Sequence, residues 1–90
     1  MIHELKILPE YFEAVRDGRT TFEIRKNDRG FKVGDVVFLN EYKDGSYTKL
    51  CVVAEITYLI DDEAFCKEGF VVFGIKRLFS FRRLWGGAAR

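Results

Sequence analysis

The dipeptide Asp44-Gly45 separates two runs of strand-forming residues, 36–42 and 47–59. A two-residue loop of this composition is a strong short-range signal for a hairpin between antiparallel strands. The second run is long for one strand, so we expect it to bend or to contain a bulge. The hairpin therefore constrains the centre of the chain to an antiparallel sheet.

Further runs of alternating or strand-forming residues predict strands on either side of this hairpin. Near the N-terminus, Pro9 suits the first position of a helix and Gly18 suits its end, which predicts a helix over 9–17. One helix and about five strands predict an α+β fold, a small mixed β-barrel with one short N-terminal helix. The additional strands are expected at 3–8, 20–26 and 70–79.

Length and composition are those of one globular domain covering residues 1–90. With 48% hydrophobic residues and a net charge of +1, the chain resembles neither a disordered segment nor a strongly cationic nucleic-acid coat. Basic residues are nevertheless concentrated in 16–32 and 76–90, so one face can still attract phosphate. The sequence has no signal-peptide pattern and no apolar stretch near the ~20 residues that span a bilayer, and we expect a cytoplasmic protein.

The residue types that hold metals are sparse. Cys51 and Cys66 are the only cysteines, and we interpret both as packed thiols. One histidine without a thiolate cluster does not fit zinc spacing, and the acidic run 61–63 lacks the calcium-loop pattern. We therefore expect no metal and no cofactor.

The segment 18–29 contains most of the candidate binding residues. Glu23 and Arg25 are two apart on a predicted strand, so their side chains share the face opposite its apolar residues. A carboxylate beside a guanidinium can accept and donate hydrogen bonds to one polar ligand edge, and an arginine can also hold a phosphate. The alternative is an exposed ion pair of little consequence. Further donors in the following turn are Lys26, Asn27 and Arg29.

Several separated motifs occur in the order found in a known family. The run G-x-x-x-x-E-x-R begins at Gly18, and F-x-V-G-D covers 31–35. Four further matching runs are H-E-L-K at 3–6, P-E-Y-F at 9–12, F-E-I-R-K-N-D-R at 22–29 and G-F-V-V at 69–72. Over residues 2–76 the chain thus resembles the ASCH domains of the PUA-like superfamily, and more narrowly a small uncharacterised family of bacterial and phage ASCH-like proteins.

The resemblance implies a PUA-like barrel with a cleft between barrel and helix that binds RNA or a nucleotide-like ligand. Some ASCH members are small amidohydrolases that act on modified nucleosides, and their motif is G-x-K-x-x-E-x-R. Gly18, Glu23 and Arg25 match this motif, but Thr20 occupies the position of the lysine. Because that lysine is the candidate catalytic group, Thr20 argues against an enzyme. If the protein is one, Glu23 would be the proton shuttle, and Lys6 or Lys26 would have to supply an amine.

His3 and Lys6 lie in the family-like run at 3–6 and are also candidate ligand residues. On a regular strand they point to opposite faces, so one pocket would not contain both without a bulge.

The segment Arg77–Trp85 interleaves arginines and aromatic residues, which is typical of surfaces that stack unpaired bases. We favour the alternative, in which Phe79 and Phe81 finish a strand and Leu84-Trp85 pack on the barrel or on a partner chain. Residues 79–90 would then be a frayed or interacting tail, with fraying expected from 86 onward. A protein-interaction adaptor that uses this tail is the third function considered, beside the binding module and the enzyme.

Overall fold

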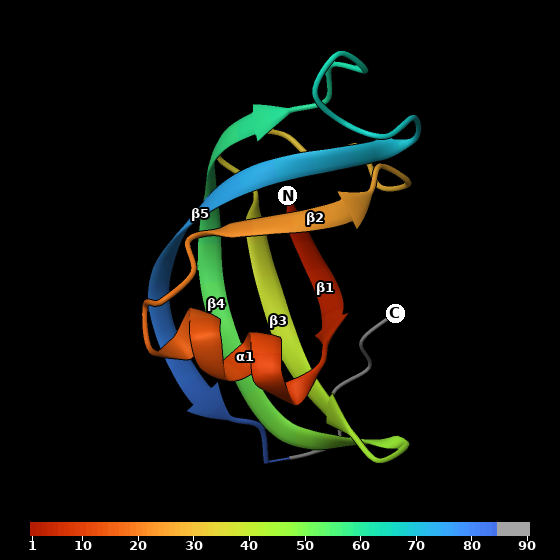
Figure 1. Ribbon diagram of the computed structural model, residues 1–90. Helices are drawn as coiled ribbons and strands as arrows, with labels where there is room; N and C mark the ends of the chain where they lie inside the picture. The colour runs from red at the N-terminus through yellow and green to blue at the C-terminus, as the bar shows by residue number, and fades with distance from the viewer. Residues whose placement is uncertain (85–90) are drawn as a thin grey trace.

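The structure is a computed structural model that describes residues 1–84. It contains one five-stranded sheet and one short helix, as Figure 1 shows. The elements are β1 (Ile2–Ile7), α1 (Pro9–Arg16), β2 (Phe22–Lys26), β3 (Val36–Lys43), β4 (Ser46–Ile60) and β5 (Phe70–Arg82). Each predicted element is therefore present, and most ends lie within two residues of the predicted ones.

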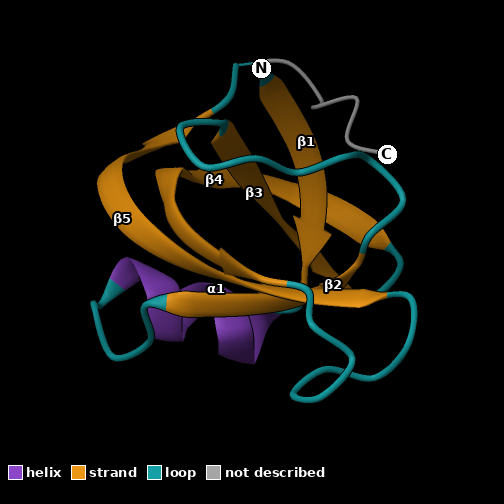
Figure 2. Cartoon of the chain, turned by 90° about the horizontal axis from the view of Figure 1, so that it is seen from above, coloured by secondary structure: helices purple, strands orange, loops and turns teal. Residues whose placement is uncertain are grey.

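The sheet is mixed and has the strand order β1-β3-β4-β5-β2. β1 runs parallel to β3, whereas the other neighbours are antiparallel. The sheet is strongly curled, as Figure 2 shows from above, and its two edge strands are β1 and β2. Because these two strands do not pair with each other, the sheet is a half-barrel that stays open along one seam. The prediction of a small barrel-like α+β fold is confirmed in this coarser form.

The central hairpin has the predicted turn. Asp44 and Gly45 have φ angles of 51° and 86°, as a two-residue loop between twisted strands requires. β4 extends over 15 residues, and its pairing with β5 shifts register twice, after Val53 and after Ile56. These irregularities bend the long strands, which lets one sheet curl around its own core.

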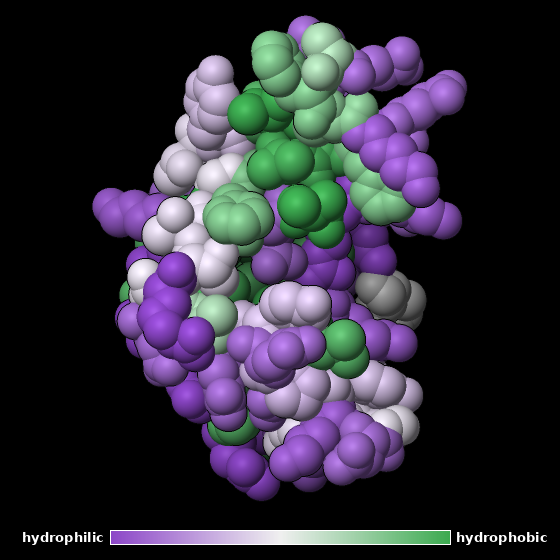
Figure 3. Space-filling view, in the orientation of Figure 1, coloured by the Kyte–Doolittle hydropathy of each residue, from purple (hydrophilic) through white to green (hydrophobic). Residues whose placement is uncertain are grey.

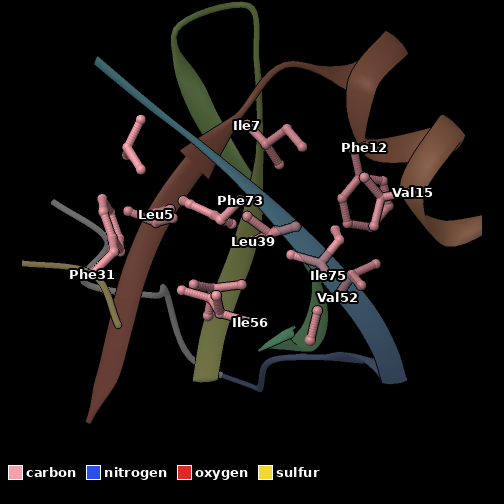
Figure 4. Close-up of a cluster of buried hydrophobic side chains, with 13 residues drawn as sticks. Leu5, Ile7, Phe12, Val15, Phe31, Leu39, Val52, Ile56, Phe73 and Ile75 are labelled. Atoms are coloured by element: carbon pink, nitrogen blue, oxygen red, sulfur yellow. The ribbon is translucent and has the colours of Figure 1, made fainter. Parts of the chain in front are cut away.

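The core fills the concave side of the sheet, as Figure 4 shows. From α1, Phe12 and Val15 are each 1% exposed and close one end of the core. β1 contributes its inward residues Leu5 and Ile7, as the alternation predicts. The remaining members of the cluster are Phe31, Val37, Leu39, Val52, Ala54, Ile56, Val71, Phe73 and Ile75.

The end of the described chain, up to Arg83, packs on the convex side of the sheet. β5 continues beyond the predicted end at 79, so Phe79 and Phe81 do finish a strand. Arg83 follows and is only 7% exposed, and its guanidinium lies over the rings of Phe38 and Phe81. Its Nη2 is 3.0 Å from both carboxylate oxygens of Glu4 on β1. This arginine is thus a structural clamp between the two ends of the described chain and is not available for phosphate.

Two other expectations about this region have different outcomes. Leu84 is 93% exposed, so it does not pack on the barrel in the described chain, whereas its packing on a partner chain stays a prediction. Trp85 and the segment 86–90 lie outside the described residues.

Both cysteines are buried, as predicted. Burial raises the pKa of Cys51 to about 11, which keeps its thiol protonated and unreactive at neutral pH. Over residues 1–84, no helix has both the length and the apolar character needed to cross a membrane.

Candidate functional site

A cleft of about 510 Å³ opens at the seam of the half-barrel, between β2, α1 and the end of β1. Figure 1 shows α1 running beneath β2 on this side of the molecule. In the same orientation, Figure 3 shows apolar residues gathered in the upper half of this face. The residues that line the cleft are Lys6, Ile7, Leu8, Tyr11, Ala14, Thr20, Phe22, Glu23, Ile24 and Arg25.

In β2 the apolar side chains are exposed and the charged side chains are largely buried. Its apolar side chains Phe22 and Ile24 are 52% and 60% exposed. The side chains of Glu23 and Arg25, on the opposite face, are only 11% and 22% exposed and point to the concave side of the sheet. The predicted alternation is therefore present, but the interpretation of Glu23 and Arg25 as an exposed surface pair is wrong.

Glu23 and Arg25 form an ion pair inside the cleft. The guanidinium Nη2 and Nε lie 2.9 Å and 3.0 Å from Oε1 of the carboxylate. Burial raises the pKa of Glu23 above its ordinary value, although the charge and hydrogen bond of Arg25 act in the opposite direction. A ligand that enters this cleft meets an acceptor and a donor side by side, in surroundings from which much of the water is excluded.

Two other residues singled out from the sequence, Thr20 and Lys6, also line the cleft. Thr20 lies at its wall. Lys6 lines the cleft as well. Its Nζ lies over the ring of Tyr42, 4.3 Å from the ring centre. Tyr11 lines the cleft and is exposed, whereas the adjacent Phe12 is buried in the core.

The other predicted residues around β2 lie outside this cleft. Gly18 ends α1 with a φ of 77°, as expected of a helix stop. The Asn27 backbone N–H bonds the carbonyl of Gly69, and the Arg29 guanidinium donates to the carbonyl of Glu4 at 2.9 Å. Lys26 and Arg29 line a separate shallow hollow of about 130 Å³. These residues extend the polar surface beside the cleft but do not form its wall.

His3 has a structural position. It is 4% exposed, and its Nε2 lies 2.8 Å from Oδ2 of the buried Asp35. Asp35 also accepts a hydrogen bond from the backbone N–H of Lys32 at 3.1 Å. His3 and Lys6 do point to opposite faces of β1, as the strand geometry predicts, and only Lys6 lines the cleft.

Sequence reasoning missed the apolar wall of the cleft. Leu8, directly before α1, and Ala14, in the second half of α1, line it. Tyr11 and Ala14 are three residues apart and therefore lie on the same face of the helix. This spacing is the signal that could have identified Ala14. Ala14 is small, and it leaves room where a larger side chain would fill the cleft.

The fold and the site together define a small curled-sheet domain with a ligand-sized cleft at its open seam. The chain belongs to the family described as domain of unknown function DUF3850, whose model matches residues 2–75. It is also 40% identical over 60 residues to an uncharacterised 12.9 kDa protein encoded in the GpA 3′ region of Escherichia phage P2. That match covers 67% of this chain and 55% of the phage protein.

Proposed function

We propose that the cleft binds a nucleotide unit, either free or as part of a single-stranded RNA. The observation that carries this proposal is the Glu23–Arg25 ion pair, which lies largely buried in a cleft whose other lining residues are partly apolar. A nucleobase carries donors and acceptors on one planar edge, and a carboxylate beside a guanidinium complements such an edge.

The size and lining of the cleft support this proposal. Its volume of about 510 Å³ falls within the range typical of small-molecule sites. Its walls are partly apolar, and the exposed ring of Tyr11 is able to stack on a base. The ammonium of Lys6 is near enough to the rim to approach a phosphate if it leaves the Tyr42 ring.

The ASCH-like motif supports the same assignment. We propose that this half-barrel is a variant of the PUA-like fold. In PUA-like domains, the segment that corresponds to residues 18–25 contributes to the ligand cleft. Here Thr20, Glu23 and Arg25 of that segment line the cleft.

Charge reversal at Arg25 tests this proposal. Arg25→Glu is expected to weaken binding of labelled single-stranded RNA and of ribonucleoside monophosphates about tenfold or more, because a charge-assisted hydrogen bond is lost and two carboxylates then adjoin. Fluorescence anisotropy at two salt concentrations, with a DNA control, measures the RNA, and calorimetry measures the monophosphates. Lys43→Glu is the matched control, because it changes the charge equally at an exposed position outside the cleft. Absence of binding by the wild type at any salt concentration contradicts the proposal.

A second candidate function is hydrolysis of an acylated nucleoside in the same cleft. It is favoured by the raised pKa of Glu23, because a carboxyl group with a raised pKa in a cleft is suited to proton transfer. Lys6 would supply the amine that Thr20 cannot.

If this enzyme reading holds, Glu23→Gln should abolish turnover of acylated nucleosides, and Thr20→Lys should increase it. Liquid chromatography of the reaction products measures both effects. Equal product formation with the wild type and with Glu23→Gln would exclude Glu23 as the proton shuttle.

A further inference from the structure

The cleft meets β2 along the edge of the strand, not on one face. Side chains alternate between the two faces of a strand, so a cavity on one face contacts every second residue. Four consecutive residues of β2, 22–25, line this cleft. Three consecutive residues, 6–8, line it from the end of β1. The cleft therefore lies between two open strand edges.

The hydrogen-bond pattern shows which backbone groups face this opening. Ile75 N–H donates to the carbonyl of Thr21, and Asn27 N–H donates to the carbonyl of Gly69, both at 2.9 Å. In an antiparallel ladder, alternate residues direct both backbone groups to the neighbouring strand. The odd-numbered residues of β2 thus bond β5, and residues 22, 24 and 26 direct their N–H and C=O away from it. Within residues 1–84, no strand pairs with this edge.

We propose that the open edge of β2, and Ile24 in particular, binds the base of the nucleotide through its backbone N–H and C=O. This inference rests on the proposed function, because it assigns a reading element to the same cleft. Ile24 is the central residue of the open edge that lines the cleft, and Glu23 and Arg25 flank it in sequence. A donor and an acceptor that point the same way match the planar edge of a nucleobase, and the side-chain pair extends this set.

An extended peptide is the other ligand that an open strand edge can bind. The surroundings of the cleft favour the compact planar ligand. α1 borders the cleft with Tyr11 and Ala14, so the side chains of an added strand would meet the helix. On the opposite edge, the carbonyl of Glu4 already accepts a hydrogen bond from Arg29, which shortens the ladder that a peptide could form with β1.

Proline substitution removes one edge donor at a time. Ile24→Pro deletes an N–H that does not bond β5, and proline is tolerated at such edge positions. Lys26→Pro deletes the next edge donor along the strand, which lies outside the cleft. Ile24→Ala and Lys26→Ala retain their N–H groups and control for the loss of each side chain.

The probes are the four ribonucleoside 5′-monophosphates, with ribose 5-phosphate as the control that lacks a base. Ile24→Pro is expected to weaken binding of at least one monophosphate about tenfold relative to Ile24→Ala, and to leave ribose 5-phosphate unaffected. Lys26→Pro should bind like Lys26→Ala. Unchanged monophosphate binding by Ile24→Pro overturns the inference and would leave the edge available to an extended peptide.

The two proposals fail in different ways. If the wild type binds neither a monophosphate nor single-stranded RNA, the proposed function itself is wrong, and the inference falls with it. If Arg25→Glu weakens binding but Ile24→Pro does not, only the role of the strand edge is overturned. Should Ile24→Pro not fold, amide hydrogen exchange on the wild type decides: added monophosphate must slow exchange at Ile24 more than at Lys26, and equal rates with and without it reject the inference.

Discussion

Replacing Asp35 with alanine is expected to lower the free energy of unfolding by about 3 kcal/mol, because the buried imidazole of His3 and the part-buried backbone N–H of Lys32 lose their acceptor. Oδ2 of Asp35 lies 2.8 Å from Nε2 of His3 and 3.1 Å from the backbone nitrogen of Lys32. These contacts join β1 to the loop that precedes β3. In a domain of this size, such a loss should lower the thermal midpoint by roughly 12 °C or more, measured by circular dichroism.

The stabilising effect of Asp35 also has a pH signature. The hydrogen bond to His3 is the main cause that lowers the pKa of Asp35 to about 2. A carboxyl with a lowered pKa in the folded state stabilises the fold fully above its unfolded pKa, near 4, and loses this effect as the pH falls toward 2. The difference in unfolding free energy between wild type and Asp35→Ala should therefore shrink as the pH falls from 4 to 2. A difference that does not change over this acid range contradicts the assignment.

Glu4→Leu should be the second strongly destabilising change, with a loss of about 2–3 kcal/mol. The guanidinium of Arg83 is buried, and this substitution removes the carboxylate with which it forms two 3.0 Å contacts. The side chain of Glu4 is 33% exposed, so we expect less than the full cost of breaking a completely buried pair. Urea unfolding, followed by far-ultraviolet circular dichroism, measures the change in unfolding free energy.

A double variant separates the cost of a stranded charge from a loss of packing. Glu4→Leu/Arg83→Met replaces both charged groups with apolar ones of similar size, and it should recover most of the stability lost in Glu4→Leu. If the double variant is no more stable than Glu4→Leu, the buried charge is not the cause of the loss.

The strands could be predicted from the sequence because their signals are local. Asp44-Gly45 has the chemistry of its turn, and Pro9 and Gly18 mark the two ends of α1. The sequence predicts the end of β5 at residue 79, three residues too early. The arginines among the last residues of β5 break the alternation that is typical of a strand buried on one face. The last residues of β5 pair with the first half of β4, for example Arg82 with Leu50, and no local sequence pattern shows this pairing.

The candidate site was predicted only in part. Alternation groups Glu23 with Arg25, but it does not say which face of β2 turns inward. That choice depends on the curl of the whole sheet and on β2 being its edge, which are properties of the assembled fold. In the same way, the partnership of His3 with Asp35 joins residues 32 positions apart, so His3 could not be recognised as structural from its neighbours.

The pairing of β2 with β5 has a consequence for the order of folding. β2 has no other strand neighbour, and Phe22 pairs with Gly74 while Lys26 pairs with Phe70. Contacts between segments so distant in sequence require a large loop to close, and they form later than local hairpins. During synthesis, β2 must therefore wait for β5 to emerge, long after α1 has been made. The β2 wall of the cleft is thus completed only after β5 has been synthesised.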